Sequence, residues 1–158
     1  MLLQKEPTFQ EVIAAVEAED EFDEIVFCGF GESLIRLDLV VCVARELKKR
    51  YGCRIRINTD GQANLVHGRN IIPELVGLVD TLSVSLNAPD ASTYTRLCNT
   101  PFGAAGFRAV CDFICETKQL LPQVIASVVS VPGVDIDACR VLAESLGATF
   151  RVREFKDE

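Results

Sequence analysis

The chain has 158 residues, of which 49% are hydrophobic and 25% are charged, the balance of an ordinary soluble globular domain. No apolar run approaches the roughly 20 residues that a membrane-spanning helix needs, and the N-terminus lacks the layout of a signal peptide, so we expect a cytoplasmic protein. The formal net charge of −7 makes nucleic acid an unlikely partner by this criterion, because nucleic-acid-binding domains usually carry a basic surface.

Helices and strands are predicted to alternate along the whole chain. The first helix is expected from Phe9 to about Glu19, with Thr8 and Glu11 as a capping box. The strands are predicted at Ile25–Cys28, Cys53–Thr59, Thr81–Asn87, Val124–Val129 and Ala148–Arg153. The remaining helices are predicted from Leu37 to a cap at Gly52, near Ile71–Val79, around Ala104–Lys118 and over Asp135–Leu146, with a long connection after the third strand. This order implies parallel strands joined by right-handed crossovers.

Three of these strands carry polar side chains at every second position. The polar sets are Arg54, Arg56 and Asn58, then Ser83, Ser85 and Asn87, then Thr149, Arg151 and Arg153. A doubly wound sheet would bury both faces, and burying that many unpaired polar groups is costly. We therefore favour an α/β fold in the form of an incomplete (βα) barrel, with about five parallel strands, outer helices and an open polar face.

Candidate binding residues lie at the ends of three predicted strands, where barrel enzymes carry their active sites. The turn Gly29-Phe30-Gly31-Glu32 would let the backbone approach a ligand, although a plain strand-to-helix turn explains it equally well. Asn58 and Thr59 offer an amide and a hydroxyl before an Asp-Gly turn. Ser85 and Asn87 end the third strand, and the alternative is a solvated edge.

Arginine, cysteine and histidine give weaker signals. Arg56, Arg151 and Arg153 could hold an anionic substrate, or could pair with the plentiful carboxylates. The seven cysteines argue against a disulfide framework, and most are expected in the core. Cys111 and Cys115 could share a metal, but their helix face is apolar, and His67 is expected at the surface.

Taken in order, the motifs resemble those of the radical S-adenosylmethionine (SAM) enzymes. The matching segments are 26–32, 56–61 and 83–90, and the end at 150–155 is most similar to the subgroup associated with TatD-type nucleases. The resemblance implies one domain over residues 1–158, a partial barrel open to its substrate. It also implies that Gly29, Phe30, Gly31 and Glu32 bind the methionyl amine of SAM. Asn58, Thr59 and Ser85 would contact its carboxylate or ribose, with Asn87 as a neighbour.

The sequence departs from the family in one major respect. Family members hold a [4Fe–4S] cluster on a Cys-x3-Cys-x2-Cys loop after their first strand, and neither that loop nor that strand has a counterpart here. Two smaller departures are Ser33 in place of proline and Asp60 in place of asparagine. The expected function is therefore the SAM-binding portion of a radical SAM enzyme of unknown substrate, which generates radicals by reductive SAM cleavage when a cluster segment is present.

The alternative is a domain without a cluster that binds SAM or another small molecule, or serves as an interaction module. An unrelated (βα) enzyme ranks last, because no nucleophile–base pair is readable. A TatD-type nuclease is a possible partner by family association. The missing strand would leave a sheet edge open, which predicts protection by formation of a homo-oligomer.

Overall fold

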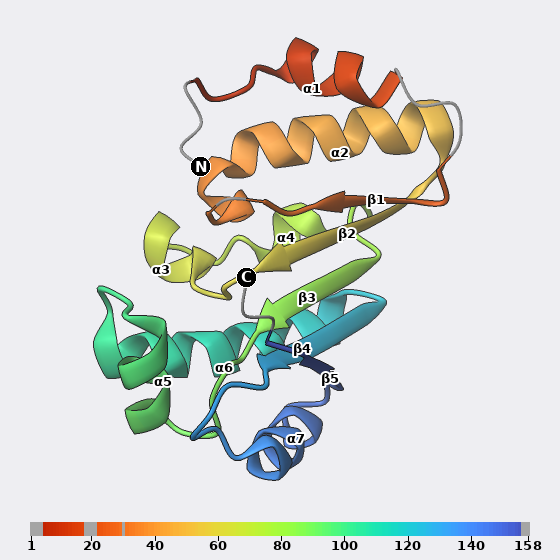
Figure 1. The fold of residues 1–158 in the computed structure, drawn as a ribbon. Coiled ribbons are helices and arrows are strands. Elements are labelled where there is room, and N and C mark those ends of the chain that lie inside the picture. The colour runs from red at the N-terminus through yellow and green to blue at the C-terminus, as the bar shows by residue number, and fades with distance from the viewer. Residues whose placement is uncertain (1–4, 18–21, 30, 156–158) are drawn as a thin grey trace.

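A five-stranded parallel sheet organises the chain (Figure 1). The computed structural model describes residues 5–17, 22–29 and 31–155. The strands are β1 (Glu24–Phe27), β2 (Arg54–Thr59), β3 (Thr81–Ser85), β4 (Gln123–Val129) and β5 (Thr149–Arg153). They lie side by side in chain order and every neighbouring pair is parallel. The predicted class is confirmed: an α/β fold with one open parallel sheet and outer helices.

The helices connect successive strands and cover the sheet from outside. They are α1 (Phe9–Glu17), the 3-10 helix η1 (Ser33–Arg36), α2 (Leu37–Tyr51), α3 (Ala63–His67), α4 (Ile72–Leu75), α5 (Ala91–Cys98), α6 (Gly103–Leu120) and α7 (Ile136–Ser145). Helices α2, α6 and α7 contact the strands directly. None of the described helices is long and apolar enough to cross a membrane.

Two short helices differ from the sequence expectation. Helix α5 lies inside the predicted long connection, where Asp90 caps it by accepting from the Thr93 amide at 2.9 Å. Helix α3 occupies the segment before the predicted short helix, which is itself only one turn long as α4. Both were missed because they are short and lie among turn-forming residues: α5 has eight residues between Pro89 and Pro101, and α3 has five between Gly61 and Gly68. The end of the predicted first helix falls outside the described residues.

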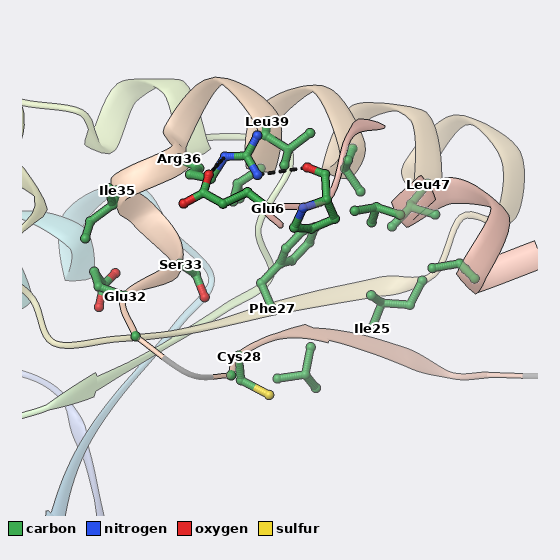
Figure 2. Close-up of a pocket in the computed structure, with 18 residues that line it drawn as sticks. Glu6, Ile25, Phe27, Cys28, Glu32, Ser33, Ile35, Arg36, Leu39 and Leu47 are labelled. Carbon is green, nitrogen blue, oxygen red and sulfur yellow. Dashed lines mark hydrogen bonds and ion pairs between the residues drawn. The ribbon is translucent and has the colours of Figure 1, made fainter. Parts of the chain in front are cut away.

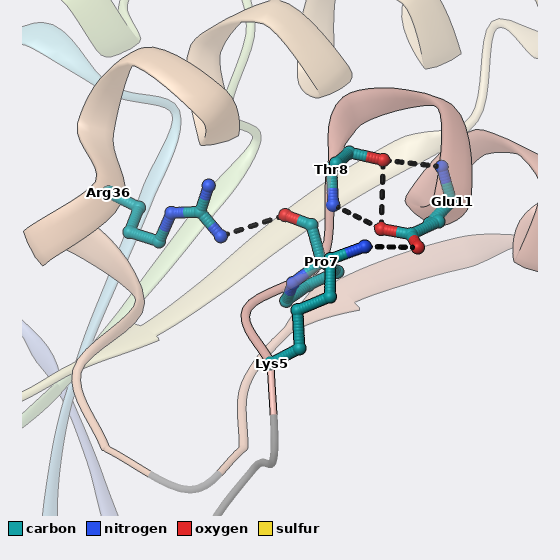
Figure 3. A network of polar contacts seen from close by, with 5 residues as sticks. All are labelled: Lys5, Pro7, Thr8, Glu11 and Arg36. Carbon is teal, nitrogen blue, oxygen red and sulfur yellow. Dashed lines mark hydrogen bonds and ion pairs between the residues drawn. The ribbon is translucent and has the colours of Figure 1, made fainter.

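The start of α1 forms the predicted capping box, which Figure 3 shows. The Thr8 amide donates to Glu11 Oε2 at 2.7 Å, and the Glu11 amide donates to Thr8 Oγ1 at 3.3 Å. Arg36 in η1 donates to the carbonyl of Pro7 at 2.8 Å. This bond ties the chain before α1 to the turn that follows β1.

The strands present an apolar side to the helices, and β2, β3 and β5 carry polar residues on the opposite side, to which β1 and β4 add Val26, Ile125 and Val129. Ile55, Ile57, Leu82, Val84 and Val128 are fully buried in the core. The register brings the alternate residues into rows on the opposite face: Arg56 beside Thr81, Asn58 beside Ser83, Ser85 beside Ser127, and Ser127 beside Arg151. We call this surface the polar face. Arg54, Asn58, Arg151 and Arg153 are exposed on it.

A matched pair of glycines tests how tightly the β2–α3 turn packs against the core. Gly61 and Gly77 have φ of +80° and +77°, but a Cβ on Gly61 would lie 2.8 Å from Val84 Cγ1, whereas none of the described atoms lies within 4 Å of one on Gly77. Gly77→Ala should cost about 1 kcal/mol of unfolding free energy from backbone strain. Gly61→Ala should cost about 2–4 kcal/mol, because overpacking adds to the same strain. Urea denaturation of both variants measures the difference, and equal losses would contradict the packing described here.

Candidate functional site

The carboxyl ends of β1, β2 and β3 bring three turns to one edge of the sheet (Figure 1). Parallel strands direct their carboxyl ends to the same edge, where ligands usually bind in such sheets. The turns contain Gly29, Gly31 and Glu32 after β1, Asp60 after β2, and Asn87 after β3. Phe30, a predicted site residue, lies outside the described residues.

The carboxylate of Glu32 joins the first two turns. Oε1 accepts from the Leu34 amide at 3.0 Å and from the Thr59 hydroxyl at 2.8 Å, and Oε2 accepts from the Asp60 amide at 2.7 Å. Gly31, which precedes Glu32, has φ of +100°, so any other residue at this position would have a strained backbone. Glu32 is therefore a structural clamp on the site as well as the cap of η1.

Thr59 and Asn58 point to opposite sides of β2. Thr59 is only 3% exposed, and its hydroxyl both donates to Glu32 and accepts from the Gly61 amide at 3.1 Å. Asn58 is exposed on the polar face in the row of Ser83. Of these two predicted residues, the exposed Asn58 side chain can reach a ligand on that face, whereas Thr59 holds the turn that carries the site.

A cavity of about 550 Å³ opens beside the second and third turns. Its polar lining includes Asp60, Ser85 and Asn87, and its apolar lining includes Leu97, Val131 and Phe155. Asn87 has φ of +58°, and its Nδ2 faces Cys98 Sγ at 3.9 Å. Its Oδ1 atom is buried and has no hydrogen-bond partner among the described residues. An unpaired buried acceptor is costly.

Helix α5 supplies one wall of this cavity, and sequence reasoning missed it. Tyr94 is 1% exposed, and its hydroxyl accepts from Gln62 Nε2 at 3.0 Å. Burial raises the pKa of Tyr94 and of Cys98, so both groups are protonated at neutral pH. The wall therefore offers neutral packing and hydrogen-bonding groups. The spacing of Tyr94, Leu97 and Cys98 after the Asp90 cap was the available sequence signal.

The three predicted arginines have different surroundings. Arg56 forms an ion pair with Glu24, with 3.1 Å between Arg56 Nη2 and Glu24 Oε2. Arg153 Nη2 donates to Ser85 Oγ at 3.3 Å, and Ser85 also lines the cavity. Arg151 lies beside Ser127 in the register and is exposed. Arg56 on β2 is thus held in an ion pair, whereas Arg151 and Arg153 on β5, which we call the β5 pair, form no ion pair with a described carboxylate.

A second cavity, of about 600 Å³, lies on the helix side between α1, β1 and α2 (Figure 2). Its lining is mainly apolar and includes Ile25, Phe27, Leu39 and Leu47, as Figure 2 shows. Glu32 and Ser33 stand at one end, and Arg36 pairs with Glu6 at 3.0 Å. The predicted site residues in its lining are Gly29, Gly31 and Glu32 from the first turn, so it does not gather the predicted site.

The residues that the structure describes do not form a metal centre. No three of their His, Cys, Asp and Glu side chains gather where they could hold a metal ion. Cys53 and Cys139 lie in the core and the half-buried Cys98 and Cys111 pack against it, while Cys28, Cys42 and Cys115 are exposed. Half-buried His67 is not a plain surface residue, because its Nε2 lies 2.8 Å from the Leu34 carbonyl oxygen. Because no three of these side chains gather at one place, the described residues do not fit a [4Fe–4S] cluster.

The comparisons with known proteins concern the fold. Neither a protein-family model nor a curated protein matches the sequence. Among solved structures, the chain is similar to a radical SAM methyltransferase from Sphaerobacter thermophilus, with a TM-score of 0.55 and 17% sequence identity. The match covers 94% of this chain and 57% of that chain. The chain therefore has a fold that resembles the radical SAM fold and spans little more than half the length of that enzyme.

Proposed function

We propose that the chain binds SAM at the carboxyl edge of the sheet, in the cavity beside Asp60, Ser85 and Asn87. The observation that carries the proposal is a cavity whose lining combines the Asp60 carboxylate with Asn87, an amide whose buried Oδ1 has no hydrogen-bond partner among the described residues. The cavity volume of about 550 Å³ lies within the range of about 300–1,000 Å³ that is typical of small-molecule sites.

The chemistry of SAM complements this lining. SAM carries a sulfonium and an ammonium against one carboxylate, so its net charge is positive and a carboxylate in the cavity wall attracts it. Its adenine amino group is an N–H donor of the kind that Asn87 Oδ1 lacks. The apolar side chains of Leu97, Val131 and Phe155 supply surface on which a purine ring could pack.

The acidic character of this corner comes from two carboxyl groups. Burial raises the pKa of Glu32 above its usual range, and the charge of neighbouring Asp60 raises it further against the opposing hydrogen bonds. Two carboxylates joined through the Asp60 amide repel each other. A bound cation beside Asp60 would relieve this repulsion, which favours a positively charged ligand.

Radical chemistry would need a cluster, and the described residues do not provide its ligands. The proposal is therefore that this chain is a single partial-barrel domain, the SAM-binding portion of a radical SAM enzyme. It would generate radicals only together with a segment that holds the cluster. The competing proposal, a domain that binds SAM or another small molecule without radical chemistry, is favoured by the same absence and predicts the same binding site.

Calorimetry on the purified chain tests SAM binding. We expect SAM to bind, and S-adenosylhomocysteine to bind about tenfold more weakly, because it lacks the sulfonium charge. Asp60→Asn should weaken SAM binding about tenfold and reduce the preference for SAM over S-adenosylhomocysteine. Asp137→Asn is the matched control, because that side chain is 95% exposed on α7. A folded chain that takes up no SAM would overturn the proposal and leave an interaction role.

The coupling of the two carboxyl groups predicts a pH effect. NMR titration should place the pKa of Glu32 above 4.5, and Asp60→Asn should lower it while Asp137→Asn leaves it unchanged. A raised pKa in the folded state means that the folded protein holds the proton more tightly than the unfolded chain. Stability from this group should therefore fall as the pH rises from about 4.5 through the folded-state pKa. An unshifted Glu32 would contradict the burial described here.

A further inference from the structure

Two arginines on β5 carry positive charge on the polar face of an acidic chain. The net charge of the chain is −7, yet no described carboxylate forms an ion pair with Arg151 or Arg153. Arg56 differs, because Glu24 already neutralises it on the same face. Within the described part of the chain, Arg151 and Arg153, the β5 pair, are thus the members of the predicted arginine set that no carboxylate neutralises.

The placement of Arg153 shows that this charge is directed toward the site. Its Cα lies beside that of Val129 on β4, but its Nη2 donates to Ser85 Oγ on β3 at 3.3 Å. Neighbouring strands are about 4.8 Å apart, so the side chain spans β4 and lies over the interior of the polar face. An arginine that only protected the sheet edge from aggregation would extend into solvent and would not cross β4 toward Ser85.

The mouth of the site therefore has two ends of opposite charge. Asp60 puts a carboxylate in the cavity lining after β2, while Arg151 and Arg153 put positive charge on β5, outside that lining. Ser85 connects the cavity to the arginines, because it lines the cavity and its hydroxyl accepts a hydrogen bond from Arg153. A cationic ligand at the acidic end would leave the basic end for a second molecule of opposite charge.

We propose that Arg151 and Arg153 bind an oxyanion group, a carboxylate or a phosphate, of the substrate that approaches the cavity. The guanidinium fork matches the paired oxygens of either group, and each arginine can donate two N–H bonds to it. The assignment of this anion as the substrate rests on the proposed SAM function, whereas anion binding itself can be measured without SAM.

The experiment is an NMR titration of the full chain at constant ionic strength, with sodium succinate in one series and inorganic phosphate in the other. We expect saturable shifts of the β5 amides and of the Arg151 and Arg153 Nε–H signals with at least one probe. The probe that binds more tightly distinguishes a carboxylate substrate from a phosphate. Arg151→Gln and Arg153→Gln should each weaken that binding about fivefold or more, and Arg153→Lys should fall between them and the parent.

Arg108→Gln is the matched control, because Arg108 is an exposed arginine on α6, the helix that packs on the apolar side of the sheet. It should leave both titrations unchanged. Equal weakening by Arg108→Gln, or an absence of saturable shifts on β5, would overturn the proposal. SAM calorimetry on Arg151→Gln tests SAM binding and anion binding independently. If this variant still binds SAM but no longer binds the anion, both the SAM site and the role of Arg151 are supported. If the parent chain binds no SAM, the anion titration still decides the role of the arginines.

Discussion

The strands of the sheet turn an apolar side to the helices, which cover that side alone, and β2, β3 and β5 carry polar residues on the other. Ile57, Val84 and Val128 are buried beneath the helices, whereas Asn58 and Arg151 are exposed to solvent. Hydrophobic burial is satisfied by one helical layer, so the charged residues stay in solvent, while the buried hydroxyls of Thr81 and Ser127 donate to Gln123 and to the Val84 carbonyl. This one-sided coverage leaves a surface on which a ligand can meet the side chains of several strands at once.

The ends of the strands turn that surface into a site. Glu32 fixes the first turn to the second through the Thr59 hydroxyl and the Asp60 amide, so the acidic residues are held at one position on the edge. Arg153 reaches from the last strand to Ser85 and fixes the opposite end. The cavity is lined by Asn87, whose amide oxygen is buried and has no hydrogen-bond partner among the described residues. Charge separation across the mouth is the basis for proposing a cationic cofactor and an anionic substrate.

The first strand of the described sheet has an open outer edge, because β1 pairs only with β2 among the described strands. The apolar cavity beneath α1 adjoins this strand (Figure 2). Such edges are usually covered in native proteins, and the homo-oligomer predicted from the sequence stays a prediction. The possible association with a TatD-type nuclease likewise stays a prediction.

The sequence by itself determined the alternation of strands and helices, the polar face and the turns that end β1, β2 and β3. These features follow from local periodicity and from glycine and capping chemistry, which a single chain displays directly. It did not show helix α5, which has only eight residues between Pro89 and Pro101, and it therefore missed Tyr94 and Cys98 as site residues. Only the tertiary structure separated Arg56, neutralised by Glu24, from Arg151 and Arg153, and only it showed that the Thr59 hydroxyl donates to Glu32. Ion pairs and hydrogen bonds between distant segments depend on strand register and side-chain reach, and neither is written in the local pattern of residues.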